Sequence, residues 1–270
     1  MFREYCAILE NKCVAPNHYV LKLKSKNIAQ AAKPGQFVQV LCSESFDPLL
    51  PRPFSFLNTT RNEFTILYQV AGKGTKILSE IEKGNSLWIL GPLGNGFTLP
   101  NPKTEKSKQY LLVGGGVGIP PLYHFAETIL KQNKKANIHV FLGGRHKSLL
   151  LCEDKFKKIR VPLHLSTNDG SKGHKGFVTD VLKSFVLSEK SEDKTIYTCG
   201  PTLMLKAVSL LAKDWNIPCE VSVEVPMACG FGVCLGCAIK VCKHETPEEH
   251  RFAIACTEGP VFMGDKILWE

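Results

Sequence analysis

Apolar and polar residues alternate in short runs through the first hundred positions. The period of two is clearest at 19–25, 37–42 and 64–70, and turn sequences such as PG, NTT and RNE separate these runs. One helical pattern, at 75–81, interrupts them. Short strands at this spacing predict a small antiparallel β-barrel over residues 1–100.

Beyond the barrel the pattern changes to strands that alternate with helices. A polar, lysine-rich stretch at 101–108 is the expected linker. The strands that follow are predicted at 109–116, 138–144, 161–167 and 195–200, and the helices at 121–132, 154–159, 176–186 and 201–214. This alternation predicts a parallel, doubly wound sheet over 101–218. With a cysteine-rich segment at 219–270, the predicted fold is a multidomain α+β chain.

Composition and charge narrow the class of protein. Of the 270 residues 44% are hydrophobic and 22% charged, which is ordinary for a globular protein. No run approaches the roughly 18–20 apolar residues that span a bilayer. Arg3 and Glu4 precede any apolar stretch, so the N-terminus does not resemble a signal peptide and we expect a cytoplasmic protein without a membrane partner.

The formal charge of +9 raises the question of nucleic-acid binding. The lysines are spread along the chain, and their densest groups, at 103–108 and 154–158, contain acidic residues. A solvated basic surface is therefore the better interpretation, and we expect no nucleic-acid partner. Such a surface also attracts phosphorylated cofactors.

Four cysteines of the last segment form the most specific motif. Cys229, Cys234 and Cys237 have the spacing C-x4-C-x2-C, and Cys256 follows them at a distance. This is the plant-type spacing of [2Fe-2S] ligands. Interspersed glycines allow the backbone to wrap closely around a cluster. A zinc site is the alternative, but zinc sites more often combine two C-x2-C pairs, and only one such pair is present here.

Two neighbouring residues compete for the ligand assignment. Cys242 and His244 lie near the motif in the sequence. Cys242 belongs to the alternating run at 238–243, which predicts a strand, whereas Cys256 leads into a second turn rich in glycine and proline. We therefore prefer Cys256 as the fourth ligand.

A glycine-rich turn follows the first predicted strand of the sheet. It contains Gly114, Gly115, Gly116 and Gly118, and Pro120 and Pro121 begin the helix after it. A strand, a glycine turn and a helix N-terminus form the geometry that holds a pyrophosphate. A glycine-rich βα turn can also be simply a tight turn, but within four βα units we favour dinucleotide binding.

The barrel segment contains a second set of phosphate-directed residues. In RPFSF, Arg52 supplies a forked cation and Ser55 a hydroxyl group within reach of a ring nitrogen. In AGKGT, Gly72 and Gly74 permit close backbone approach, and Thr75 can cap the helix that begins there. Two such sites in different domains indicate two nucleotide cofactors.

Cys199 ends the last predicted strand of the sheet. Open parallel sheets bind ligands at this edge, so the thiol is a candidate for contact with a nicotinamide. A small buried residue before a helix is an equally good interpretation from the residues alone.

The motifs RPFS, GKGT, GGGVGIPPL, NDGSKGHKGFVTD, CGPTLMLKA and CGFGVCLGC…CTEGPVF occur in this order. Together they resemble, over the whole length, the ferredoxin-reductase-like electron-transfer subunit of NAD-dependent (type B) dihydroorotate dehydrogenase. The resemblance implies FAD in the barrel, NAD in the α/β domain and a [2Fe-2S] cluster in the last segment. It implies flavin contacts from Arg52, Pro53, Phe54, Ser55, Leu67, Tyr68 and Gln69, phosphate contacts from Gly74 and Thr75, and iron ligation by Cys229, Cys234, Cys237 and Cys256.

The resemblance also implies an activity. The chain would pass electrons from the FMN of a dihydroorotate dehydrogenase catalytic subunit, through [2Fe-2S] and FAD, to NAD⁺ in de novo pyrimidine (UMP) synthesis. Ser55 would act at the flavin and Cys199 near the nicotinamide. All three segments are assigned, which leaves no room for the roughly 250-residue barrel expected for an orotate site. Dihydroorotate oxidation would thus take place on a partner chain, in a heterotetramer of two subunits of each kind.

Coenzyme preference and partner are less determined. The second strand of the sheet is followed by Arg145 and His146, where NAD sites usually have an acidic residue, and a cation there suits a 2′-phosphate. Three alternatives remain open: a related FAD/[2Fe-2S] subunit of a ferredoxin:NADP or sulfide oxidoreductase, a free-standing flavin reductase, and a zinc-stapled nucleotide-binding module without electron transfer.

Overall fold

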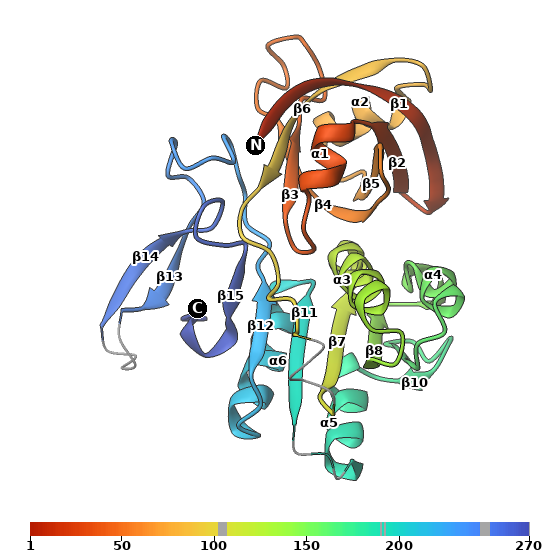
Figure 1. Ribbon diagram of the computed structural model, residues 1–270, viewed down its shortest axis with the longest axis vertical. Coiled ribbons are helices and arrows are strands. Elements are labelled where there is room, and N and C mark those ends of the chain that lie inside the picture. The colour runs from red at the N-terminus through yellow and green to blue at the C-terminus, as the bar shows by residue number, and fades with distance from the viewer. Residues whose placement is uncertain (102–106, 190, 192, 244–248, 270) are drawn as a thin grey trace.

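The computed structural model describes residues 1–101, 107–189, 191, 193–243 and 249–269. It consists of a β-barrel, a sheet covered by helices, and a smaller C-terminal part beside them (Figure 1). Most of the predicted linker, and His244, lie outside the described residues.

The barrel confirms the predicted antiparallel architecture of the N-terminal part. Its strands close in the order β1-β2-β5-β4-β3-β6. Alternate residues such as Leu21, Leu23 and Ile66 have no exposed surface and form its core, as a period of two requires. The bounds are β1 Phe2–Ala15, β2 His18–Lys24, β3 Phe37–Val40, β4 Arg52–Thr59, β5 Glu63–Gln69 and β6 Ser86–Leu93.

The barrel carries two helices, α1 (Lys26–Ala31) and α2 (Lys73–Glu80). The prediction of a single helix in this part was therefore wrong. Helix α1 has only six residues, too few to show a helical period, and its start depends on Ser25, whose Oγ accepts a hydrogen bond from the backbone N–H of Ile28 at 3.1 Å.

The central sheet confirms the doubly wound prediction. Its strand order is β10-β9-β8-β7-β11-β12-β15, parallel as far as β12 and antiparallel at β15. The strands β9-β8-β7-β11-β12 have the order 3-2-1-4-5 when they are numbered along the chain with β10 left out. The direction of winding therefore reverses between β7 and β11. The bounds are β7 Gln109–Gly115, β8 Asn137–Gly144, β9 Leu163–Thr167, β10 His174–Lys175, β11 Lys194–Cys199, β12 Cys219–Ser222 and β15 Val261–Met263.

Helices cover both faces of this sheet. Leu112 and Val140 pack on one face together with α3 and α4, whereas Leu111 and Phe141 pack on the other together with α5 and α6. Neighbouring strand residues thus alternate between two apolar cores. The helices are α3 Ile119–Gln132, α4 Glu153–Lys158, α5 Val178–Ser188 and α6 Thr202–Asp214, and short 3₁₀ turns lie at Gly116–Gly118, Lys147–Leu149 and Gly264–Lys266.

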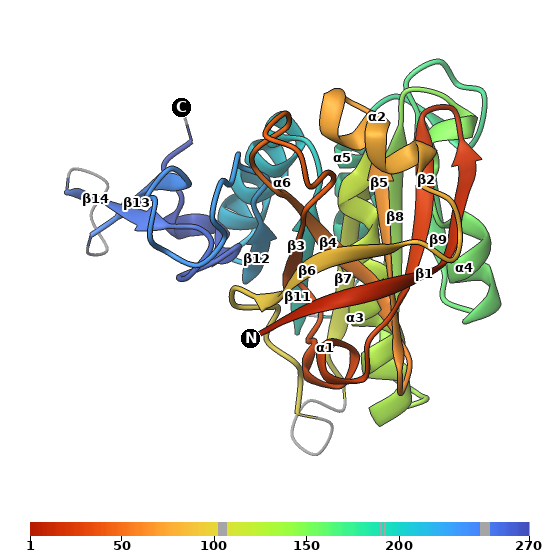
Figure 2. The same cartoon turned by 90° about the horizontal axis from the view of Figure 1, so that it is seen from above.

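The C-terminal part forms a separate hairpin and then adds one strand to the large sheet. Strands β13 (Ala238–Cys242) and β14 (His250–Ile254) form a hairpin that extends away from the barrel and the sheet (Figure 2). Cys242 lies in the strand predicted for it. Strands β12 and β15, at either end of the cysteine-rich segment, pair with each other in the large sheet. The boundaries 1–100, 101–218 and 219–270 remain a proposal.

Among the described residues, no helix combines the length and the apolar character needed to cross a membrane.

Candidate functional site

A cleft of about 240 Å³ lies where the barrel meets the sheet. The barrel contributes β4, β5 and the start of α2, and the sheet contributes the loops that follow β7, β11 and β12. This is the edge at which the winding reverses, the usual ligand position in such sheets. The predicted site residues that line the cleft are Pro53, Phe54, Ser55, Leu67, Tyr68, Gln69, Thr75, Gly118 and Cys199.

Tyr68 holds the barrel side of the cleft in place. Its hydroxyl group donates to Asn11 Oδ1 at 3.0 Å, and its ring packs against Tyr19 and Phe54 with centroid distances of 5.6 and 5.7 Å. Burial raises the pKa of Tyr68, so the phenol stays neutral. The side chain is thus part of the barrel core as well as a boundary of the cleft.

The start of α2 presents a positive region beside the cleft. Thr75 Oγ1 accepts hydrogen bonds from the backbone N–H groups of Ala71 and Gly72 at 3.0 and 3.1 Å. A Cβ atom at Gly74 would lie 3.3 Å from Nε of Arg52, so the guanidinium group lies directly beside the first turn. A helix N-terminus next to a guanidinium group is well suited to a phosphate. Arg52 and Gly74 are not among the residues that line the cleft itself.

The predicted dinucleotide turn lies across the cleft. Gly114 and Gly115 end β7, Gly116 and Gly118 form the 3₁₀ turn, and α3 follows. Gly116 has φ +55° and open space around it, whereas a Cβ atom at Gly118 would lie 2.4 Å from the backbone nitrogen of Gly200. Gly118 is therefore required for close packing of two βα turns, and of these four glycines only it lines the cleft.

Cys199 lies at the carboxyl end of β11 and lines the cleft with 7% of its surface exposed. Burial raises the pKa of its thiol to about 12. The group is thus a neutral, weakly polar contact at physiological pH and not a thiolate nucleophile.

The structure adds cleft residues that the sequence analysis missed. The most informative is Glu224, which follows β12; part of its surface is exposed, and burial of the rest raises the pKa of its carboxyl group. Strand β12 was assigned to the cysteine-rich segment, so its carboxyl end was not examined as a ligand-binding edge. The other added residues are Phe37, Ala71, Val117, Ser222, Val223, Val225, Met227 and Pro260.

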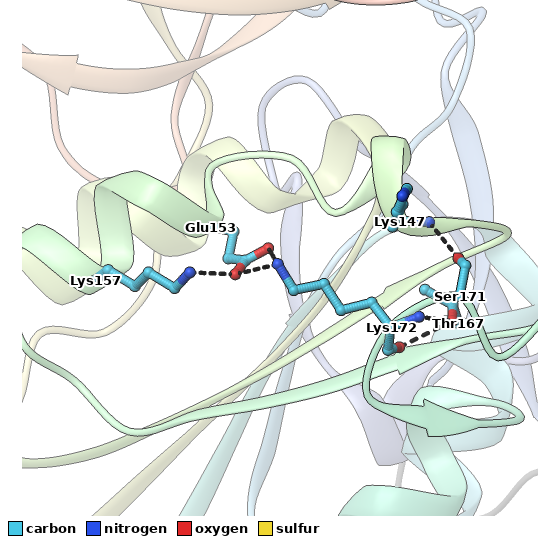
Figure 3. A network of polar contacts seen from close by, with 6 residues as sticks. All are labelled: Lys147, Glu153, Lys157, Thr167, Ser171 and Lys172. Atoms are coloured by element: carbon cyan, nitrogen blue, oxygen red, sulfur yellow. Dashed lines mark hydrogen bonds and ion pairs between the residues drawn. The ribbon is translucent and has the colours of Figure 1, made fainter.

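A polar network holds together the loops after β8 and β9 (Figure 3). Lys172 Nζ donates to both carboxylate oxygens of Glu153 at 2.8 Å, and Lys157 Nζ lies 2.6 Å from the same group. Burial opposes the charge on Glu153, but the two lysines outweigh it and lower its pKa. The backbone N–H of Lys147 donates to Ser171 Oγ at 2.8 Å. The network fixes the sheet edge where the ribose of a dinucleotide is expected.

The four predicted iron ligands lie together as two pairs. The backbone N–H of Cys234 donates to Cys229 Sγ at 3.5 Å, and that of Cys256 donates to Cys237 Sγ at 3.4 Å. Burial opposes ionisation of Cys229, but N–H groups of Cys234, Phe231 and Val233 outweigh it and lower its pKa to about 6. Burial and the neighbouring Cys237 raise the pKa of Cys256 to about 12.

This arrangement fits a two-iron cluster. The backbone N–H of Gly232 also donates to Cys256 Sγ, at 3.2 Å, so amide groups of the loop point at the sulfurs as cluster sites require. Two pairs of thiolates suit two irons. Among the described residues, these cysteines included, no three His, Cys, Asp or Glu side chains lie in an arrangement that already matches a metal site.

Comparisons with known proteins match the two parts of the chain that contain these sites. Residues 112–210 match the family described as oxidoreductase NAD-binding domain. Residues 224–268 match the iron-sulfur cluster binding domain of dihydroorotate dehydrogenase B, a range that includes all four cysteines. The chain is 31% identical to a chain of the NADH-dependent reduced ferredoxin-NADP oxidoreductase, with a TM-score of 0.84 over 98% of this chain and 90% of that chain. A ferredoxin NADP⁺ reductase from Neisseria gonorrhoeae, 16% identical with a TM-score of 0.66 over 79% of this chain and 92% of that chain, shares the fold.

Similar sequences extend over nearly the whole chain. The protein named dihydroorotate dehydrogenase B (NAD(+)), electron transfer subunit, from Desulforamulus reducens is 39% identical over 259 residues, which cover 95% of each chain. The protein of the same name from Bacillus cereus is 36% identical over 271 residues, covering 99% of this chain and all of the relative. On this similarity, together with the matched cluster domain, the chain belongs to the family of dihydroorotate dehydrogenase B electron transfer subunits.

Proposed function

We propose that this chain passes electrons from the FMN of a dihydroorotate dehydrogenase catalytic subunit, through a [2Fe-2S] cluster and FAD, to NAD⁺ in pyrimidine synthesis. One observation carries the proposal: Phe37 of β3 lines the cleft and also packs in one apolar cluster with Cys237 and Cys256. The cysteine loop thus lies directly behind the wall of the nucleotide cleft. Electron transfer between a cluster in the loop and a flavin in the cleft requires such proximity.

The barrel residues would bind and orient the flavin. Pro53, Ser55, Leu67 and Gln69 line the cleft where an isoalloxazine ring fits. The guanidinium group of Arg52 and the N-terminus of α2 would hold its phosphates. When bound, FAD exchanges electrons singly or in pairs, the cluster exchanges one at a time, and the nicotinamide exchanges a hydride.

The sheet residues would position the nicotinamide. Gly118 and Cys199 face the barrel residues across the cleft. A nicotinamide ring placed against these two residues would therefore lie next to a flavin bound to the barrel. The thiol of Cys199, whose pKa burial raises to about 12, contacts that ring without competing as a nucleophile.

A partner chain would supply the dihydroorotate site and the FMN. The relatives are named electron transfer subunits. In this chain the cysteine loop exposes Phe231, Val233 and Leu235, with 44%, 73% and 60% of their surfaces accessible, and such an apolar surface suits docking. We propose a heterotetramer of two subunits of each kind. Eleven cysteines, none of them paired in a disulfide, suit the reducing cytoplasm that we propose as the location.

A related reductase is the second candidate. The similarity to a chain of ferredoxin-NADP oxidoreductase, at 31% identity, favours it, as does Arg145 after β8. Anaerobic reduction of the purified protein by NADH and by NADPH separates the two: we expect NADH to reduce it faster by at least tenfold, and the reverse preference would favour this second candidate.

The central test is the visible spectrum of anaerobically purified protein, with iron and acid-labile sulfide assays. We expect flavin and cluster absorption together, and bleaching by NADH. Protein that contains neither iron nor sulfide, or bound zinc alone, would contradict the proposal. Dihydroorotate should reduce the chain only when the catalytic subunit is present.

Ser55→Ala tests the flavin side specifically. The Ser55 hydroxyl lines the cleft, and loss of one neutral hydrogen bond to the ring is worth about 1 kcal/mol. We expect reduction by NADH to slow about fivefold in stopped-flow measurements, while the cluster spectrum stays intact. Unchanged flavin reduction would remove Ser55 from this role.

A further inference from the structure

Gln39 of β3 is a buried amide without a hydrogen-bond partner. The side chain has 1% of its surface exposed, and neither Oε1 nor Nε2 has a partner among the described residues. Buried side-chain amides are nearly always satisfied, so an amide with both polar atoms unpaired requires an explanation. Gln39 does not line the nucleotide cleft, so a bound flavin there is not that explanation.

The surroundings of Gln39 point to the cysteine loop. A Cβ atom at Gly230 would lie 2.7 Å from Cγ and 2.8 Å from Nε2 of Gln39, so the amide lies directly beneath the backbone next to Cys229. Gly230 has φ +82°, a conformation that brings the loop close at this point. The amide therefore lies beside the start of the loop that carries three of the four cysteines.

Strand β3 connects this position to the cleft. Phe37, two residues earlier on the same face of the strand, lines the cleft and packs with Cys237 and Cys256. Gln39 is paired in register with Pro53 of the neighbouring strand β4, another cleft residue. One short strand thus touches the expected flavin site and the expected cluster site.

We propose that the Gln39 side-chain amide donates a hydrogen bond to an inorganic sulfide of the [2Fe-2S] cluster. The inference rests on the proposed cluster site. Sulfur atoms beside Gly230 are the acceptors that the loop would bring to this buried pocket, and they are satisfied by N–H donors. Gln39 is then a positioning residue that belongs to the barrel and donates to the cluster.

Such a bond has a measurable consequence. An N–H···S bond stabilises the more negative, reduced cluster, so it raises the reduction potential. Removal of the donor should make the potential more negative without altering the iron ligands. Because Gln39 belongs to the barrel that would bind FAD, the barrel would also influence the reduction potential of the cluster.

Gln39→Met tests this directly, because methionine keeps the length of the side chain and removes the N–H donor. We expect the ratio of reduced to oxidised cluster at a fixed poise to fall about tenfold, which corresponds to 59 mV for a one-electron couple. Gln109→Met is the matched control: Gln109 is 6% exposed, has an unpaired Oε1 and lies at the start of β7, away from the cysteine loop. Its cluster potential should not change.

A second measurement detects the hydrogen bond by spectroscopy. In wild-type protein with glutamine labelled by ¹⁵N in the side chain, pulsed EPR of the reduced cluster should show a ¹⁵N coupling, and Gln39→Met should abolish it. Wild-type protein that holds a cluster but shows neither the coupling nor a changed potential in Gln39→Met would overturn this inference alone. Wild-type protein without iron and sulfide would overturn the proposed function too.

Discussion

Two glycine-rich turns lead into helices on opposite sides of the cleft, and they differ in what their glycines contact. At α2 the nearest atoms to a Cβ on Gly74 belong to the flexible side chain of Arg52, at 3.3 Å, and Gly72 has open space. At α3 a Cβ on Gly118 would meet backbone atoms of Cys199 and Gly200 within 2.5 Å. In sequence the two turns look alike.

The difference shows that a glycine-rich turn can serve two purposes. The turn at α2 leaves room around a positive helix start, which is what a bound phosphate needs. The turn at α3 uses Gly118 to let two βα turns of the sheet pack against each other, and only Gly116 there remains open. The barrel turn therefore has the space that our proposed phosphate site needs, whereas the sheet turn uses its glycine in part for packing.

Gly118→Ala should lower the stability of the protein more than any other glycine substitution in these two turns. The added methyl group has no flexible neighbour to displace, so we expect a loss of about 3 kcal/mol in the free energy of unfolding, at the top of the range for overpacking. Urea unfolding of the apo-protein measures it. Gly72→Ala, in open space and extended backbone, is the control and should cost less than 1 kcal/mol. Equal losses would contradict the distinction.

His124 of α3 can show whether this helix packs against the barrel in solution. The ring is 3% exposed, its Nε2 lies 3.5 Å from Thr59 Oγ1 of β4, and burial lowers its pKa to about 4. In the unfolded chain the His124 ring becomes protonated below about pH 6.5, whereas in the folded chain it becomes protonated only below about pH 4. Stability should therefore fall by roughly 3 kcal/mol as the pH decreases through this window.

His124→Phe provides the comparison for that measurement. Phenylalanine retains an apolar ring but cannot be protonated, so the difference between wild type and variant isolates the histidine from the carboxylates that titrate at the same pH. We expect the wild type to lose more stability than the variant between pH 6.5 and pH 4 in urea unfolding. Parallel pH profiles would show that the ring is not buried against the barrel in solution.

Thr75→Val should affect the barrel turn. The substitution leaves the backbone N–H groups of Ala71 and Gly72 without their acceptor, which should cost about 1–2 kcal/mol and weaken FAD retention. Thr75→Ser keeps the hydroxyl group and serves as control. FAD content after gel filtration, together with urea unfolding, checks both effects; a valine variant that retains FAD like wild type would contradict a role for this turn in cofactor binding.

Gly116→Ala should have the smallest effect. The position has φ +55° but no atom within 4 Å of a Cβ, so only the left-handed backbone is penalised, by about 1 kcal/mol. A loss as large as that of Gly118→Ala in the same urea experiment would mean that both glycines of the turn are packed.

Long, periodic or closely spaced patterns could be predicted from the sequence. The barrel, the doubly wound sheet and the strand that contains Cys242 were all expected from local periodicity. Helix α1 and strand β1 were not expected: α1 is too short for a period, and many β1 residues face solvent or are half-buried, which weakens the alternation. The return of β15 to the sheet depends on a pairing with β12 some forty residues earlier, which no local pattern encodes.

The candidate site divides in the same way. The spacing of Cys229, Cys234 and Cys237 predicted a cluster loop because ligands close in sequence must be close in space. The roles of Glu224 at the cleft and of the unpaired amide of Gln39 could not be predicted in this way. Each depends on contacts with residues of another segment of the chain.

The types of element, the motifs and the chemistry of their side chains follow from the amino-acid sequence, because these depend on neighbours within one turn or one strand. Three other features emerge only in the folded chain: the two glycine turns face one cleft, Gly118 packs against Gly200, and Phe37 and Gln39 lie between the cleft and the cysteine loop. Burial and close contact arise where two surfaces meet, and the surfaces that meet here come from segments far apart in the chain.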